Sequence, residues 1–256
     1  MKLKKPAEAI NDFEKAIELD SENPKIYNGL GMAYHLLGDR DEALDNMNRA
    51  LDKESTSIEF LMDRATIYLD MRLHSEAYAD LDTALTICPD DPLLFYKRGI
   101  VLFASMSYDD CIEDLHRSIE CNPDESYEPD IYYHIGIAWA RKDEFEMSIP
   151  PLSKCISMKP NKAVYYHERA KSFQMIGEHQ MALNDFNVVI ENQPKNAHAH
   201  FRRAYSYKCL KMYNEAAEDM FSARQLAPDD SSMIVNAKQM TDISIMIVAQ
   251  PGEEQV

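Results

Sequence analysis

Glycine and positive charge are both scarce in this sequence, and each shortage excludes a class of function. Only 7 of the 256 residues are glycine, and no glycine-rich loop of the kind that cradles phosphate groups occurs. Lysine and arginine number 27 against 44 aspartate and glutamate residues, which gives a net charge of −17. Phosphate backbones bind to concentrated positive charge, so we expect no nucleic-acid partner. Residues 1–128 hold 13 basic and 28 acidic side chains, whereas residues 129–256 hold 14 and 16, so the acidity is concentrated in the first half.

Long apolar runs and secretion signals are also missing. The N-terminus lacks the apolar core of a signal peptide, and the longest apolar stretch, Ile243–Ala249, is too short to span a bilayer. We therefore expect a protein that is soluble and makes no membrane contact. The five cysteines form no CxxC pair, and we interpret them as reduced packing residues of the cytosol, with the nucleus or a cilium as alternatives. They are Cys88, Cys111, Cys121, Cys155 and Cys209.

Motifs for metal binding and catalysis are absent as well. The eight histidines show neither an HExxH pattern nor paired Cys/His spacing, so we expect no metal ion and no cofactor. No nucleophile motif occurs either. The sequence therefore predicts a protein that is not an enzyme.

The sequence does contain a repeating unit, shown most clearly by residues 163–196. Tyr166, Ala170 and Phe173 recur at the spacing that places them on one helical face, and Gly177 then interrupts the run. A second amphipathic run follows, and Pro194 prevents it from continuing. Two short helices cannot bury both of their faces, so the unit needs neighbours.

The same residue types recur 34 positions before and after this unit. Ala170 corresponds to Gly136 and Ala204, while Pro194 corresponds to Pro160 and Pro228. A period of 34 with small residues at these places resembles the tetratricopeptide repeat (TPR) superfamily, and the resemblance covers almost the whole chain. It implies an all-α fold, a right-handed α-solenoid of stacked helix-turn-helix units. The small residues are expected where helices approach most closely, as at Gly99, Gly136 and Ala182.

The repeat divides the chain into segments. Residues 1–23 are expected to form a lone helix, equivalent to the second helix of an incomplete repeat, which favours a fragment of a longer protein over a natural cap. Six units follow at 24–57, 58–91, 92–125, 129–162, 163–196 and 197–230, with three extra residues at 126–128. Pro150 and Pro151 fall inside one expected helix, which should therefore start late or bend. Residues 231–256 should form a capping helix and a tail, whose apolar part, Ile243–Val248, we expect to pack on the last repeats rather than join two copies.

The resemblance also implies where partners bind. In the TPR family the first helices line a concave groove, and their inward-facing residues contact partner peptides. In the first two units these positions hold Lys25, Asn28, Met32, Glu59, Met62, Asp63 and Thr66. The partner-binding residues that we single out lie further along: Tyr96, Lys97, Ile100, Phe103, Tyr133, His134, Ile137, Arg141, His167, Lys171, His198, Phe201, Arg202, Tyr205 and Lys208. Many are large and apolar, as a protein-binding surface requires. Lys171, Arg202 and Lys208 favour an acidic partner segment toward the C-terminal half.

We interpret the chain as a scaffold or adaptor that binds partner peptides or subunits in the TPR groove. Two alternatives remain open: a transient client-binding assembly factor or co-chaperone, and a fixed structural subunit of a large assembly such as a cilium. The dicarboxylate clamp of some TPR co-chaperones needs Lys, Asn and Arg at set places on three first helices. Met32, Asp63 and Leu93 stand at such places here, so the sequence does not contain this clamp.

Overall fold

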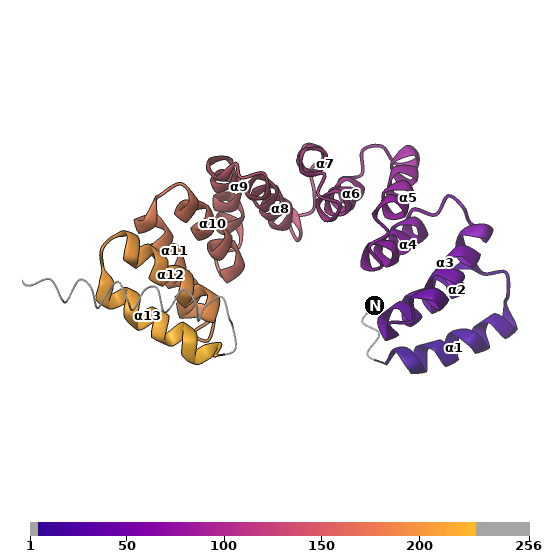
Figure 1. Cartoon of the computed structure of the whole chain (residues 1–256). Coiled ribbons are helices and arrows are strands. Elements are labelled where there is room, and N and C mark those ends of the chain that lie inside the picture. The colour runs from indigo at the N-terminus through magenta and orange to yellow at the C-terminus, as the bar shows by residue number, and fades with distance from the viewer. Residues whose placement is uncertain (1–4, 229–256) are drawn as a thin grey trace, which may run out of the picture. The chain divides into compact units, whose positions relative to one another are not determined.

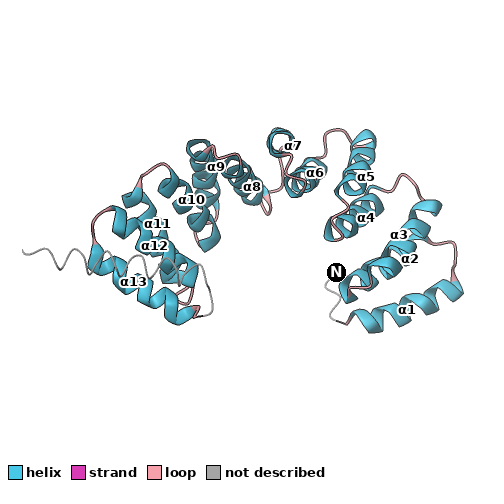
Figure 2. Cartoon of the chain, viewed as in Figure 1, coloured by secondary structure: helices cyan, strands magenta, loops and turns pink. Residues whose placement is uncertain are grey.

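The computed structural model describes residues 5–228, and within this range helices are the only regular secondary structure (Figures 1 and 2). The expected all-α solenoid of helical repeats is confirmed. The predicted capping helix and apolar tail, residues 231–256, lie outside the described residues. No helix within residues 5–228 is long and apolar enough to cross a membrane.

The helices between residues 5 and 228 alternate between first and second members of a repeat. The lone helix α1 spans Pro6–Leu19. The first helices are α2 (Pro24–Leu37), α4 (Ile58–Asp70), α6 (Pro92–Ala104), α8 (Glu128–Arg141), α10 (Ala163–Met175) and α12 (Ala197–Cys209). The second helices are α3 (Arg40–Lys53), α5 (His74–Ile87), α7 (Tyr108–Glu120), α9 (Phe145–Met158), α11 (His179–Asn192) and α13 (Tyr213–Leu226). Five of the first helices begin at the first residue of a unit inferred from the sequence, and α8 begins one residue earlier.

The chain divides into two compact units, Met1–His134 and Ile135–Val256, and the boundary falls within α8. In the first unit, α2 packs on α3, α4 on α5 and α6 on α7, while in the second unit α10 packs on α11 and α12 on α13. Consecutive first helices also contact one another: α2 with α4, α4 with α6, and α10 with α12. Each unit therefore presents a layer of first helices, which we call its first-helix face.

Small residues allow the two helices of a repeat to approach closely. A Cβ atom added to Gly99 would lie 2.9 Å from Cδ2 of Leu115 on α7. At Gly136 the same atom would lie 2.5 Å from Cγ of Leu152 on α9. Ala182, another of the small residues in the sequence pattern, is completely buried. These contacts have the closeness that the sequence pattern predicts.

The turn between the two helices of each repeat contains one residue in the left-handed conformation. Gly38 and Gly177 occupy it with φ angles of 92° and 83°. The other four repeats place side-chain-bearing residues there, although such residues rarely adopt positive φ. These are Arg72, Met106, Asp143 and Lys211, with φ angles of 61°, 65°, 61° and 62°. The backbone geometry is thus the same in all six turns, whereas glycine is present in only two.

Helix α9 starts at Phe145 and runs through both Pro150 and Pro151. The late start considered from the sequence does not occur. In a regular helix, the amides missing at the prolines would bond to the carbonyls of Glu146 and Met147, four residues earlier. Both of those residues are exposed, so water can satisfy their carbonyls.

The cysteines are all free, but they do not share one environment. Cys111 and Cys155 are buried, and Cys88 and Cys121 are half-buried, as expected for packing residues. Burial raises the pKa of the Cys111 thiol to about 12, so it stays protonated. Cys209 is exposed at the last position of α12. The interpretation of Cys209 as a packing residue was therefore wrong.

In four repeats, an arginine of the first helix forms an ion pair with an aspartate of the second helix. In each pair the guanidinium donates two hydrogen bonds, of 2.6–2.8 Å, to the two carboxylate oxygens. The pairs are Arg64–Asp80, Arg98–Asp114, Arg169–Asp185 and Arg203–Asp219. Each Nη1 also donates to the preceding second helix, at Asn48, Asp82, Ser153 and Asn187 respectively. One side chain thus joins three consecutive helices.

Candidate functional site

The first-helix face of the first unit contains an apolar cavity of about 180 Å³ between α4 and α6. Tyr96, Lys97 and Ile100, which the sequence singled out, all line it. The remaining wall consists of Met62, Ala65, Thr66, Leu69, Leu81 and Val101. The hydroxyl of Thr66 donates to the carbonyl of Met62 at 2.9 Å, so it is already satisfied. Among the described residues that line the cavity, Lys97 is the one that carries a charge, so the cavity suits an apolar side chain.

An aromatic cluster lies next to this cavity in the first unit. The Tyr96 ring stacks on Tyr127 with centroids 5.4 Å apart and meets the edge of His134 at 5.9 Å. Phe103 and Tyr133 also make edge contacts with His134, at 6.2 and 5.3 Å. His134 Nδ1 lies 2.6 Å from the carbonyl oxygen of Asp130. Burial lowers the pKa of His134, so its ring is neutral near pH 7 and serves here as a packing group.

A polar contact joins α2 and α4 on the same face. The Asn28 amide donates a hydrogen bond to the Asp63 carboxylate at 3.0 Å. Burial raises the pKa of Asp63, although the Asn28 bond and the nearby Lys97 charge oppose the change. Asn28 is itself only 7% exposed. We regard this pair as a link between two repeats.

The first-helix face of the second unit contains a charged cavity of about 200 Å³, which we call the cationic cavity. Ile137, Arg141, Lys171 and Arg202, all singled out by the sequence, line it. The lining is completed by Ala140, Asp143, Phe145, Glu168, Ser172 and Met175. It thus holds three cations and two carboxylates. Lys171 donates to Glu168 at 2.7 Å, whereas neither Arg141 nor Arg202 forms an ion pair with any carboxylate in residues 5–228.

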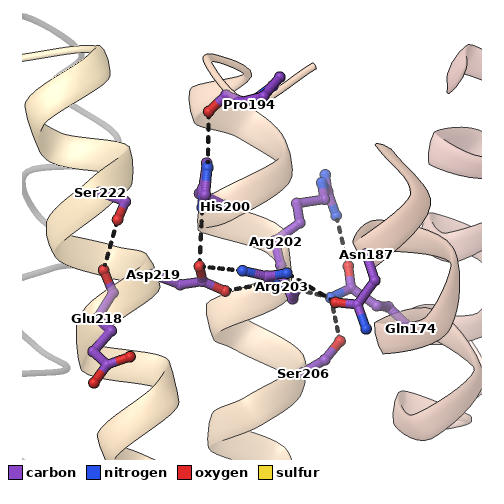
Figure 3. Close-up of polar contacts among 10 residues, drawn as sticks. All are labelled: Gln174, Asn187, Pro194, His200, Arg202, Arg203, Ser206, Glu218, Asp219 and Ser222. Carbon is purple, nitrogen blue, oxygen red and sulfur yellow. Dashed lines mark hydrogen bonds and ion pairs between the residues drawn. The ribbon is translucent and has the colours of Figure 1, made fainter. Parts of the chain in front are cut away.

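A buried glutamine holds Arg202 in place (Figure 3). Gln174 is 6% exposed, and its amide donates to the carbonyl of Arg202 at 2.6 Å and to the Ser206 hydroxyl at 2.7 Å. Its carbonyl oxygen lies 3.5 Å from Nη1 of Arg202. Gln174 therefore anchors the backbone of Arg202 through a short hydrogen bond and makes a longer contact with its guanidinium.

His167 and His198 line another cavity of the second unit, of about 350 Å³, together with Ala163, Val164, Val189, Gln193 and Asn196. Burial lowers the pKa of His167, and Lys171 and Arg202 lower it further against the opposing effect of Glu168. Its Nδ1 is buried and has no hydrogen-bond partner among the described residues. No group of three or more potential metal ligands occurs between residues 5 and 228.

The other three residues singled out in the second unit lie outside both cavities. Phe201 packs against the core formed by Ala204 and Met220. Tyr205 is 49% exposed, and its ring meets the edge of His179. Lys208 is half-buried on the last turn of α12 and lines neither cavity. The three basic residues expected to cluster are thus split, since Arg141 takes the place of Lys208.

Sequence reasoning missed several residues that shape these sites. Phe145 and Met175 line the cationic cavity, and Gln174 positions Arg202. The repeat pattern carries no signal for Gln174 and Met175, because the equivalent positions of other repeats hold unrelated residues, whereas the aromatic Phe145 recurs as Tyr108 and Tyr213. The arginine–aspartate pairs, in contrast, recur at a fixed separation of 16 residues and could have been found.

Comparison with known proteins finds similarity to TPR-repeat proteins in sequence and in structure. A family model described as TPR repeat matches residues 1–38. Human tetratricopeptide repeat protein 6 is 27% identical over 119 residues, covering 46% of this chain and 23% of the relative. The anaphase-promoting complex subunit CDC16 of Saccharomyces cerevisiae is 23% identical, covering 96% of this chain and 26% of the relative. The chain thus spans about a quarter of the length of these two relatives.

Solved structures show the same fold. PilW, described as a type IV pilus biogenesis factor, superposes with a TM-score of 0.74 at 18% identity, covering 83% of this chain and 97% of that one. YrrB, described as a TPR protein with an unusual peptide-binding site, gives a TM-score of 0.64 at 18% identity, covering 75% of this chain and 97% of that one. In its repeat motif and in its fold, the chain is thus similar to proteins of the tetratricopeptide repeat superfamily.

Proposed function

We propose that this chain is a scaffold or adaptor that catalyses no reaction and holds protein partners against its first-helix faces. The observation that carries the proposal is the cavity between α4 and α6. Tyr96 and Ile100 are large apolar side chains that line it without being required by the repeat. Exposed apolar recesses rimmed by charge are typical of protein-binding surfaces. The TPR superfamily is a protein-interaction fold, which supports this class of function.

The two units differ in the partner chemistry that they suit. The cavity of the first unit favours an apolar side chain, because Lys97 is its one charged lining residue. The cavity of the second unit favours an acidic segment, because it is lined by Arg141 and Arg202, which form no ion pair within residues 5–228. We expect the association rate of an acidic partner to fall with added salt and with Arg202→Glu. An association rate independent of salt would contradict this part of the proposal.

One comparison favours a second candidate, a fixed subunit of a large assembly. The relative CDC16 is described as a subunit of the anaphase-promoting complex, and its similarity covers 96% of this chain. Such a subunit would bury the same faces permanently.

We place the protein in the cytosol, with the nucleus or a cilium as alternatives, because its cysteines are free.

A peptide-display selection against the whole chain tests the proposal. We expect enriched peptides that bind the native chain, and loss of their binding when Tyr96→Ala and Tyr133→Ala are combined. Phe221→Ala is the matched control, because Phe221 is a 66% exposed aromatic residue on the second helix α13. Circular dichroism should be the same for all variants. Selected peptides that bind the double variant as well as the native chain would place the interface elsewhere.

A further inference from the structure

We infer that the cationic cavity receives a single glutamate side chain of the partner and selects it over a phosphorylated serine. This inference rests on the proposed function, since it assumes that a polypeptide lies along the first-helix face of the second unit. The inference specifies which side chain of the partner occupies the cavity and explains why a phosphoserine side chain does not.

The size of the cavity indicates one side chain. Its volume is about 200 Å³. Sites for small-molecule ligands and cofactors have volumes of about 300–1,000 Å³, so this cavity is smaller than such a site. A carboxylate with one or two bridging waters is a suitable occupant, because each water needs only about 10–15 Å³ of accessible space.

The charges in the lining select an anion that carries a single charge. Arg141, Lys171 and Arg202 face Asp143 and Glu168, which leaves an excess of one positive charge. Glu168 is already paired with Lys171, so the two arginines supply the free donors. A glutamate carboxylate neutralises this excess. A phosphoserine carries a charge of about −1.5 to −2 at pH 7, and its excess negative charge would face the two carboxylates of the lining.

The apolar part of the lining favours glutamate over aspartate. Ile137, Phe145 and Met175 line the same cavity as the arginines, and Met175 is 58% exposed. Long charged side chains bury their methylene stems against apolar surface while the charged end reaches a polar partner. Glutamate has two methylene groups for this contact, whereas aspartate has one.

Arg202 is held ready for its ligand before binding. Gln174 bonds to the carbonyl of Arg202 and lies within 3.5 Å of its Nη1. Figure 3 shows the Arg202 side chain beside Gln174, while the neighbouring Arg203 turns to Asp219 and Asn187. The two consecutive arginines thus have different roles: Arg203 is paired with Asp219, whereas Arg202 has no carboxylate partner among residues 5–228. A held donor loses less conformational freedom on binding.

Arginine side-chain NMR of the whole chain tests the inference directly. The probes are three acetylated, amidated tripeptides of sequence Ala-X-Ala, in which X is glutamate, glutamine or phosphoserine. We expect the glutamate peptide to shift the Nε resonances of Arg141 and Arg202, the phosphoserine peptide to bind more weakly, and the glutamine peptide to cause no shift. Equal or tighter binding of the phosphoserine peptide would overturn the inference, and so would an absence of shifts at both arginines.

Two variants test whether the peptide binds in the cavity itself or is only attracted by the positive potential around α12. Arg202→Gln should weaken binding of the glutamate peptide about tenfold or more, because charged hydrogen bonds are lost. Lys208→Gln removes the same charge from the same helix but outside the cavity, and should change binding less than about twofold at ordinary salt. Equal losses in the two variants would show that the field alone attracts the peptide. A positive result here together with a failed display selection would keep the glutamate site and reject the proposed scaffold function.

Discussion

Arg203 of α12 donates two hydrogen bonds to Asp219 of α13, at 2.6 and 2.7 Å, and a third to Asn187 of α11 at 2.8 Å (Figure 3). Asp219 is 5% exposed. The aspartate side chain raises the pKa of the Arg203 guanidinium by accepting its hydrogen bonds, so the guanidinium is charged at every ordinary pH. Arg64, Arg98 and Arg169 form the equivalent ion pairs in their own repeats, so this contact recurs between the two helices of four repeats.

Loss of one partner of this pair should destabilise the second unit. Arg203→Met keeps most of the side-chain volume but leaves the Asp219 carboxylate buried without its guanidinium. We expect a loss of about 3 kcal/mol in the free energy of unfolding, since breaking a buried pair costs about 3–5 kcal/mol. Urea denaturation measures it. Arg224→Met is the control, because Arg224 is exposed on α13, and a similar loss in both variants would contradict the role of the pair.

Much of the fold follows from local sequence rules. The period of 34 residues placed Gly99 and Gly136 at close helix contacts, and the structure has Leu115 and Leu152 against them. Such positions are predictable because only a small residue fits there, whatever the rest of the repeat contains. The left-handed turns were harder to predict, since Met106 and Lys211 carry no glycine signal.

The candidate site was only half predictable. The repeat identifies which residues of a first helix face inward, and it correctly indicated that Tyr96, Lys97 and Ile100 share one surface. It does not show which of those residues meet in a cavity. The cationic cavity needs Phe145 from a second helix and Asp143 from a turn. Those contacts depend on tertiary packing, which periodicity does not encode.

Filling a close contact between two helices should unfold the array at a lower denaturant concentration. A Cβ atom on Gly136 would lie 2.5 Å from Leu152 Cγ, so even Gly136→Ala forces the leucine to move. We expect Gly136→Leu and Ala182→Leu each to lose about 1–3 kcal/mol by overpacking. Glu191→Gln, at an exposed position of α11, should change nothing. Equal denaturant midpoints for the three variants would contradict the helix contacts described above.

Introducing glycine at a left-handed turn should stabilise the protein. Met106 has a φ of 65° and is 74% exposed, so its side chain contributes little packing. A left-handed conformation costs a residue with a Cβ atom about 1–2 kcal/mol, and glycine avoids that cost but loses more entropy on folding. We therefore expect Met106→Gly to raise the thermal midpoint, with a net gain of up to about 1 kcal/mol. Met106→Ala keeps the strain and should give no gain, so equal midpoints for both variants would refute the explanation.

His134 should make the first unit less stable in mild acid. Burial holds the pKa of His134 below its ordinary value of about 6.5, so the unfolded chain binds its proton more readily than the folded chain. The stabilising effect of the neutral ring is complete above the unfolded pKa and is lost as the pH falls toward the folded one. His134→Phe keeps a ring beside Tyr96 and Phe103 but cannot bind a proton. Urea unfolding at about pH 7.5 and 5 should show a smaller acid-induced loss in this variant than in the native chain, and an equal loss would contradict the prediction.

The fourth repeat lacks both members of the arginine–aspartate pair. With the three extra residues counted, the equivalents of Arg98 and Asp114 are Ile135 and Pro151. Ile135 is only 2% exposed. The joint replacement has a physical reason, because either charged residue alone would be buried without its partner. Removing both partners leaves an apolar contact that carries no such penalty.

This reasoning predicts a strong coupling between positions 135 and 151. Ile135→Arg alone should destabilise the second unit by about 3 kcal/mol or more, because the guanidinium is buried opposite a proline. Pro151→Asp alone places a carboxylate where no arginine reaches it, although it restores a helix amide. The double variant can form the pair seen in four other repeats and should be more stable than the sum of the single changes predicts, by about 1–3 kcal/mol. Urea denaturation of the native chain and the three variants gives this coupling energy. If the two changes are additive, the fourth repeat does not share the geometry that allows Arg203 to reach Asp219, and the equivalence of these positions is wrong.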